Sequence, residues 1–148
     1  MRIEVVKDRR PELVEELVAV WESAVRATHD FLANDEVERI KAYVGPALAQ
    51  VERLVVAFDE NGRPVAFMGV ADGRLEMLFV SAGLRGRGVG SALLARGMAE
   101  YGLRELTVNE QNPAAVAFYE HKGFVAYRRS DHDEEGGPYP LLYMRLQA

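Results

Sequence analysis

The chain has 148 residues, a formal net charge of −5 and no cysteine. This length predicts a single domain over residues 1–148, with a sizeable core. The absence of cysteine excludes disulfides, thiolate metal sites and a cysteine nucleophile. The acidic balance is not that of a nucleic-acid binder, and no apolar run approaches the ~18 residues of a membrane span. We therefore expect a cytoplasmic protein with neither nucleic-acid nor membrane partners.

The first half of the chain predicts a strand, two helices and three further strands. "RIEVVK" alternates like a strand, and apolar residues then recur at helical spacing over 11–27, where a proline suits the first helical turn. A second helix is predicted over 35–50, with a break around Gly45-Pro46. Residues 53–80 are predicted to form three strands, because Asn61-Gly62 and Asp72-Gly73 are hairpin turn signals.

The second half predicts two helical crossovers between strands. A helix follows the glycine-rich segment, and "RELTVNE" is a short strand. The next helix is well bounded, since Asn112 can cap it, Pro113 suits its first position and Gly123 suits its end. "FVAYRRS" and "PLLYMRL" close the chain as strands. This order predicts the α/β (α+β) class, a mixed sheet covered by helices.

The segment "GLRGRGVG", residues 83–90, indicates a phosphate site. It precedes a predicted helix, whose first backbone N–H groups and dipole attract anions. Glycines let a ligand approach the backbone closely. Arg85 and Arg87 can add charge-assisted hydrogen bonds, and no acidic residue occurs between Glu76 and Glu100.

Known phosphate-binding loops can be compared with this segment. A P-loop needs a lysine after its last glycine, and Val89 follows Gly88. A dinucleotide fingerprint would need a glycine where Ser91 stands, although Glu110 resembles the acidic residue that binds a ribose. The short flanking segments leave little room for a doubly wound fold. A trimmed nicotinamide-nucleotide binder therefore stays as an alternative.

A third pattern, Arg/Gln-x-x-Gly-x-Gly/Ala, matches residues 85–90 and follows the strand "LEMLFV". Together with "LTVNEQN" and "AVAFYEHKGF", it makes residues 75–127 resemble the GNAT (Gcn5-related) N-acetyltransferases. "ATHDFL" and "PYPLL" are similar to segments of small single-domain bacterial members. The resemblance implies the GNAT fold: a mixed, mostly antiparallel sheet of about seven strands with about four helices. It also implies that the two central strands splay apart.

The resemblance further implies acetyl-CoA as the co-substrate, with its pyrophosphate on the amides of the glycine loop. The pantetheine arm would pair with the end of the strand before that loop, Asn112 would lie near the arm, and Tyr119 near the sulfur. The implied cofactor-binding residues are Leu78, Phe79, Val80, Arg85, Gly86, Arg87, Gly88, Val89, Gly90, Ser91, Asn112 and Tyr119.

Acetyl transfer to an amine sets the catalytic needs. A lysine-like amine has a reference pKa near 10.4 and a thiol one near 8.5, so loss of the amine proton is the larger obstacle. Tyr119 is the candidate acid for the departing thiolate; core packing is the alternative. Glu76 is the candidate base and would share a strand face with Leu78 and Val80 by alternation. A solvated glutamate, with a water chain as the base, is the alternative.

The acceptor would be a small-molecule or peptide amine, bound near His29, Asp30 and Tyr139. His29 could take a proton, or it could serve in capping or loop contacts. Acidic residues between 131 and 135 either attract a cationic acceptor or form a solvated loop. We expect no metal and a monomer or homodimer. A non-catalytic acyl-CoA sensor is the second alternative to the enzyme.

Overall fold

A computed structural model describes residues 1–147. The order of its strands and helices is the predicted one, with one short 3-10 helix, η1, added before the glycine loop. The elements are β1 (Arg2–Val5), α1 (Pro11–Thr28), α2 (Asn34–Gln50), β2 (Arg53–Phe58), β3 (Pro64–Ala71), β4 (Arg74–Val80), η1 (Ala82–Leu84), α3 (Val89–Glu100), β5 (Glu105–Asn109), α4 (Pro113–His121), β6 (Phe124–Ser130) and β7 (Leu141–Leu146).

The strands form one seven-stranded sheet in the order β1-β2-β3-β4-β5-β7-β6. All neighbouring strands are antiparallel except β4 and β5. The predicted hairpins are confirmed, since β2 pairs antiparallel with β3 and β3 with β4. Asp72 and Gly73 have φ 52° and 75°, the left-handed values of a two-residue turn, and Gly62 has φ 77° in a longer turn that begins at Asp59. The predicted mixed, mostly antiparallel sheet with four α-helices is therefore confirmed.

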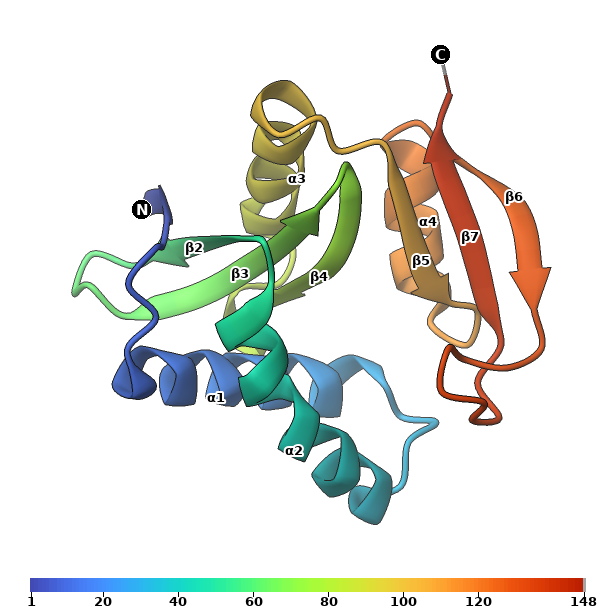
Figure 1. Cartoon of the computed structure of the whole chain (residues 1–148), viewed down its shortest axis with the longest axis horizontal. Coiled ribbons are helices and arrows are strands. Elements are labelled where there is room, and N and C mark those ends of the chain that lie inside the picture. Colours follow the sequence, from blue (N-terminus) through green and yellow to red (C-terminus); the bar gives the residue numbers. More distant parts are fainter. Residues whose placement is uncertain (148) are drawn as a thin grey trace.

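Strands β4 and β5 pair only over a short stretch. Their parallel register joins Arg74 to Glu105 and Leu75 to Leu106. Beyond these pairs the two strands diverge, as Figure 1 shows between the green and orange arrows. The rest of β4 is hydrogen-bonded to β3 on one side only. This divergence is the splay that the family resemblance implied.

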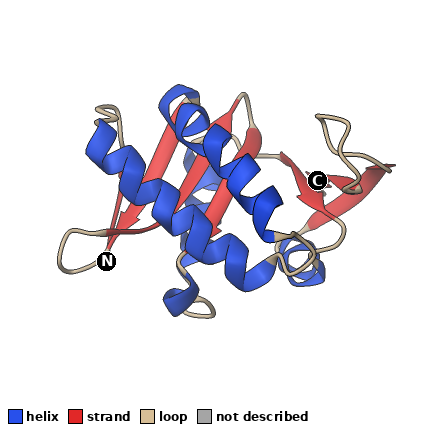
Figure 2. Cartoon of the chain, turned by 90° about the horizontal axis from the view of Figure 1, so that it is seen from below, coloured by secondary structure: helices blue, strands red, loops and turns tan. Residues whose placement is uncertain are grey.

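Helices cover both faces of the sheet, as Figure 2 shows. One core lies between the sheet and α3 with α4, and Leu93, Phe124 and Met144 are among its fully buried side chains. The other lies between the sheet and α1 with α2, around Leu17 and Phe67. Within residues 1–147, no helix has both the length and the apolar character needed to cross a membrane. The two cores fix α1, α3 and α4 around the open end of β4.

Helix α2 corrects one expectation, because it runs without a break through Gly45 and Pro46. Proline removes one backbone hydrogen bond from a helix. The neighbouring turn is held by packing: a Cβ on Gly45 would lie within 4.0 Å of Val14 and Val18 of α1. Close packing between the two helices overrides the local preference for a break.

Strand β4 corrects a second expectation. Gly69 pairs with Met77 and Val70 pairs with Leu75, so Glu76 is the extra residue of a β-bulge. The bulge interrupts strict alternation. Leu78 packs on the side of α3 and α4, whereas Glu76 lies beside Arg39 and Ile40 of α2. Strict alternation therefore no longer fixes the face on which Glu76 lies, although Glu76 and Leu78 border a common cavity.

Candidate active site

The glycine loop ends at an uncapped helix N-terminus. Gly86 has φ 77° and Gly88, the N-cap residue of α3, has φ 81°, a conformation that favours glycine. A Cβ at either position would meet no atom within 4 Å. In the part of the chain that the structure describes, no side chain caps α3, so its first N–H groups face open space. This arrangement can bind an anion such as a phosphate.

A cavity of about 520 Å³ extends from this loop along β4 to α1 and α4. It brings together almost all of the cofactor-binding residues expected from the sequence. Those that line it are Leu78, Phe79, Val80, Arg85, Gly86, Gly88, Val89, Gly90, Ser91, Asn112 and Tyr119. Arg87 does not line it, and its side chain is exposed.

A smaller cavity of about 160 Å³ occupies the gap between the splayed strands. We call it the junction cavity, because β4 residues 75–79 and β5 residues 107–109 both border it. It adjoins the larger cavity, with which it shares His29, Asn112 and Tyr119. Asn112 also caps α4, as predicted, by accepting a hydrogen bond from the Ala115 N–H at 3.3 Å.

Tyr119 is a buried residue of the expected site, with 8 % of its surface exposed. Its ring packs edge-on against Phe118 and Phe124, so core packing and a place in the cavity are combined. Burial raises the pKa of the phenol, and the ring is therefore neutral at physiological pH. No buried polar side-chain atom in residues 1–147 lacks a partner.

A third cavity, of about 340 Å³, adjoins the junction cavity through Leu75, Glu76 and Thr107. We call it the acidic mouth, because four carboxylates border it: Glu76, Asp133, Glu134 and Glu135. Burial raises the pKa of Glu76, and the charge of Glu134 acts in the same direction while Arg74 opposes both. Glu76 thus lies where the outer opening meets the junction.

His29 lies directly after α1 and borders both the large cavity and the junction cavity. Its Nδ1 is 2.7 Å from the Thr28 hydroxyl, and its ring packs against Phe31 at 5.3 Å between centroids. Burial lowers the pKa of the imidazole, and the charge of Asp30 opposes this effect. Asp30 itself is exposed and lines none of the three cavities.

Tyr139 does not line these cavities either. Its hydroxyl donates a 2.8 Å hydrogen bond to Glu36 of α2, and its ring lies 6.2 Å from that of Phe31. Arg39 of α2 pairs with Glu135 at 3.7 Å. These contacts attach to α2 the loop between β6 and β7, which carries three of the carboxylates of the acidic mouth.

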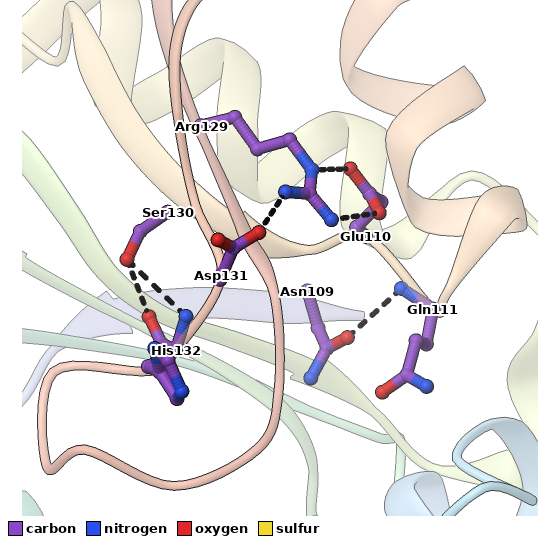
Figure 3. A network of polar contacts seen from close by, with 7 residues as sticks. All are labelled: Asn109, Glu110, Gln111, Arg129, Ser130, Asp131 and His132. Atoms are coloured by element: carbon purple, nitrogen blue, oxygen red, sulfur yellow. Dashed lines mark hydrogen bonds and ion pairs between the residues drawn. The ribbon is translucent and has the colours of Figure 1, made fainter.

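Glu110 is engaged by an arginine. Arg129 donates two hydrogen bonds to its carboxylate, at 2.6 and 3.0 Å, and also contacts Asp131 (Figure 3). The bonds from Arg129 lower the pKa of Glu110. A nucleotide-binding sheet would also be doubly wound and parallel, whereas this one has a single parallel pair. The hypothesis of a nicotinamide-nucleotide binder is therefore wrong.

Two site features were missed from the sequence. Thr28 contacts His29 and lines the large cavity; only its place beside His29 in "ATHDFL" could have indicated this. Thr107 borders both the junction cavity and the acidic mouth and accepts a hydrogen bond from Arg74. That contact spans 33 residues and leaves no local pattern.

Comparison with known proteins agrees with this geometry. A family model described as an acetyltransferase (GNAT) domain matches residues 14–146. The chain is 39% identical to the peptidyl-lysine N-acetyltransferase YjaB of Escherichia coli over 137 residues, 93% of this chain and 92% of that protein. YjaB of Salmonella typhimurium is 37% identical over 93% of this chain and 94% of its own length.

The solution structure of apo YjaB from E. coli matches with a TM-score of 0.86 and 38% identity, covering 98% of this chain and 97% of that one. An aminoglycoside 6'-N-acetyltransferase solved with coenzyme A shares the fold, with a TM-score of 0.60 at 17% identity over 97% and 95% of the two chains. The chain thus belongs to the GNAT acetyltransferase family and is an acyltransferase.

Proposed function

We propose that the protein transfers the acetyl group of acetyl-CoA to the side-chain amine of a lysine in a peptide or protein. The observation that carries this proposal is that three cavities adjoin one another in a row. The first fits a phosphate-bearing cofactor, the second lies between splayed strands, and the third is bordered by carboxylates. The name of the YjaB relatives, peptidyl-lysine N-acetyltransferase, supports the same acceptor.

The cofactor would bind with its pyrophosphate on the N–H groups at the start of α3, with Arg85 adding charge. Its pantetheine arm would lie along the open edge of β4, where residues 78–80 have hydrogen-bond partners only in β3. An extended chain can join such an edge as an added strand. This placement brings the thioester to the junction cavity, beside Asn112 and Tyr119.

The acceptor would enter through the acidic mouth. Two guanidinium groups, of Arg39 and Arg74, also border it, and they pair with Glu135 at 3.7 Å and with Glu134 at 3.8 Å. The carboxylates still outnumber the guanidinium groups, so the local field favours a cation. Glu76, at the inner end, would bind the lysine ammonium group at the entrance to the junction.

The reaction would be a direct attack in a ternary complex. The neutral amine nitrogen adds to the thioester carbonyl carbon, and the tetrahedral intermediate expels the thiolate of CoA. Burial raises the pKa of Tyr119, so full proton transfer to a thiolate of reference pKa near 8.5 is uphill. We therefore assign Tyr119 a hydrogen bond to the developing thiolate. The chain has no cysteine that could carry the acetyl group.

The experiment combines purified protein, acetyl-CoA and a synthetic lysine peptide, with an arginine-for-lysine peptide as the matched control. Mass spectrometry should locate one acetyl group on the lysine, with equimolar release of CoA thiol. Intersecting initial-velocity plots are expected for a ternary complex, and parallel plots would indicate a covalent intermediate. Acetylation of free diamines but not of peptides would refute the peptide acceptor. Tight binding of acetyl-CoA without transfer to any amine would favour the sensor.

A further inference from the structure

The Thr28 hydroxyl at the end of α1 contacts two groups at once. Its Oγ1 lies 2.8 Å from the Ala24 carbonyl oxygen and 2.7 Å from His29 Nδ1. A hydroxyl has one hydrogen, and a carbonyl oxygen can only accept. The hydrogen of Thr28 therefore goes to Ala24. His29 must then donate from Nδ1 to the Thr28 oxygen, so its neutral ring has no hydrogen on Nε2.

The Nε2 atom is on the far side of the ring from Thr28 and is accessible. Within residues 1–147, Nε2 makes no hydrogen bond. Every buried polar side-chain atom in these residues has a hydrogen-bond partner. Because Nε2 has none, it is not a buried atom. His29 borders both the large cavity and the junction cavity, so its ring lies beside the space assigned to the thioester.

Burial keeps the His29 ring neutral at pH 7, against the effect of a neighbouring charge. Burial lowers the pKa of His29 more than the neighbouring Asp30 raises it. From the other elements around the two cavities, Glu76 of β4, the neutral phenol of Tyr119 on α4 and Arg85 of the glycine loop are the titratable or charged groups. The carboxylate of Glu76 borders only the junction cavity and the acidic mouth.

We propose that His29 Nε2 accepts the proton of the acceptor ammonium group and that Thr28 is the positioning residue that fixes the required tautomer. This inference rests on the proposed function, in which an ammonium group reaches the junction cavity. One proton passes from the ammonium group to Nε2, and the neutral nitrogen attacks the thioester. The nitrogen loses a second proton when the intermediate collapses, and the thiolate gains one. His29 then releases its proton to water, so the products are amide, CoA thiol and one proton.

Imidazole suits this step better than the carboxylate of Glu76. Reference pKa values near 6.5 and 4.3 make proton transfer from an amine roughly 100-fold less unfavourable for histidine. Burial shifts the pKa of each group toward that of the other and so reduces this difference. Position also favours His29, because the attacking nitrogen must lie beside the cofactor. His29 borders both the large cavity and the junction cavity, whereas Glu76 borders the junction cavity and the acidic mouth.

The first test needs no acceptor. In ¹⁵N-labelled protein at pH 7, long-range ¹H–¹⁵N correlation spectra should show His29 with a protonated Nδ1 and a pyridine-like Nε2. Thr28→Val should shift the ring toward the other tautomer, and Thr28→Ser should restore the wild-type pattern. A protonated Nε2 in the wild-type protein would overturn the proposal even if the acceptor assignment is also wrong.

The second test follows the rate. Measured at saturating acetyl-CoA, His29→Gln should lower kcat/KM for a lysine peptide at pH 7 about 100-fold, with little change in melting temperature. The remaining rate of the variant should rise with pH, as the ammonium group of the peptide loses its proton to the solvent. With an aminooxy peptide, whose amine is neutral at pH 7, the loss should be under about 5-fold, because no proton must leave first. Exposed His121→Gln is the matched control. Equal losses with both peptides would refute the base assignment, whereas a wild-type protein inactive on every lysine peptide would refute the acceptor assignment.

Discussion

Tyr139 and Glu36 are joined by a 2.8 Å hydrogen bond although 103 residues separate them in the chain. The bond attaches the loop between β6 and β7 to α2, and that loop carries three of the four carboxylates of the acidic mouth. A tertiary contact between two distant segments therefore holds this side of the acidic mouth.

Removing this bond should loosen the acidic mouth without affecting the cofactor. We expect Tyr139→Phe to raise KM for a lysine peptide about 2- to 10-fold, the range for one lost hydrogen bond. The acetyl-CoA dissociation constant should stay unchanged, because Tyr139 does not line the large cavity. Steady-state kinetics and calorimetric titration measure the two constants. A parallel loss of acetyl-CoA affinity would show that this contact also supports the cofactor side.

The acidic mouth predicts a salt-dependent preference for cationic peptides. The double variant Glu134→Gln, Glu135→Gln should raise KM for a lysine-rich peptide at low salt, since two attractive charges are lost. The difference from the wild type should shrink toward 1 M salt, where the Debye length is about 3 Å. The double variant Glu15→Gln, Glu16→Gln makes the same charge change on exposed positions of α1 and is the control. If both double variants behave alike, net charge and not the mouth attracts the peptide.

The left-handed backbone conformation at Gly88 favours glycine over any residue with a side chain. Its φ of 81° is unfavourable for alanine, so Gly88→Ala should destabilise the protein by about 1–2 kcal/mol. The loop would relax away from the left-handed conformation, and acetyl-CoA affinity should fall roughly 10-fold. Gly83→Ala is the control, because a Cβ there meets nothing within 4 Å and its φ is not in the left-handed range. Denaturant unfolding and calorimetric titration of both variants decide the matter.

The Tyr119 hydroxyl should matter for turnover and not for folding. We expect Tyr119→Phe to lower kcat about 10- to 100-fold, the range for a hydrogen bond to a charged group. The ring contacts with Phe118 and Phe124 would remain, so the melting temperature should not change. Tyr127→Phe, on the exposed side of β6, is the matched control. An unchanged kcat would remove Tyr119 from the reaction and leave it a core residue.

The Glu110–Arg129 pair predicts a pH dependence of stability. Because Arg129 lowers the pKa of Glu110 in the folded protein, the pair stabilises the fold above the unfolded-state pKa, near 4.3. This contribution is lost as the pH falls through the lowered folded-state pKa. Arg129→Gln should therefore melt at a lower temperature than the wild type at pH 7, and the two curves should converge in acid. Thermal melting of both proteins across about pH 2 to 7 tests this.

Local chemistry was enough to predict many of the elements. Asn112 and Pro113 signal the start of α4 through capping and a fixed φ, and the structure confirms both. The glycine-rich segment 83–90 predicts a loop that a ligand can approach closely, and the positive φ values of Gly86 and Gly88 agree with this. Each of these features depends on residues within one or two turns of the chain, which is why the sequence was sufficient.

The errors arose where distant segments meet. The bulge at Glu76 cannot be read from "RLEMLFV", because a run of mostly apolar residues gives no alternation in which a shift would be visible. Helix α2 continues through Pro46 because of its packing on α1. The tautomer of His29 depends on how Thr28 is already bonded. Such features need the tertiary structure.

The short pairing of β4 with β5 has a consequence for how the molecule resists unfolding. Two register pairs, Arg74 with Glu105 and Leu75 with Leu106, join the halves of the sheet in strand order. A bound cofactor lying across the remaining edge would contact both halves of the sheet, β1–β4 and β5–β7, and link them for as long as it stays bound. Saturating acetyl-CoA at 100 times its dissociation constant should stabilise the fold by about 2.7 kcal/mol. Amide hydrogen exchange should slow most along the facing edges of these two strands, so the ligand that brings the acetyl group would also complete the sheet.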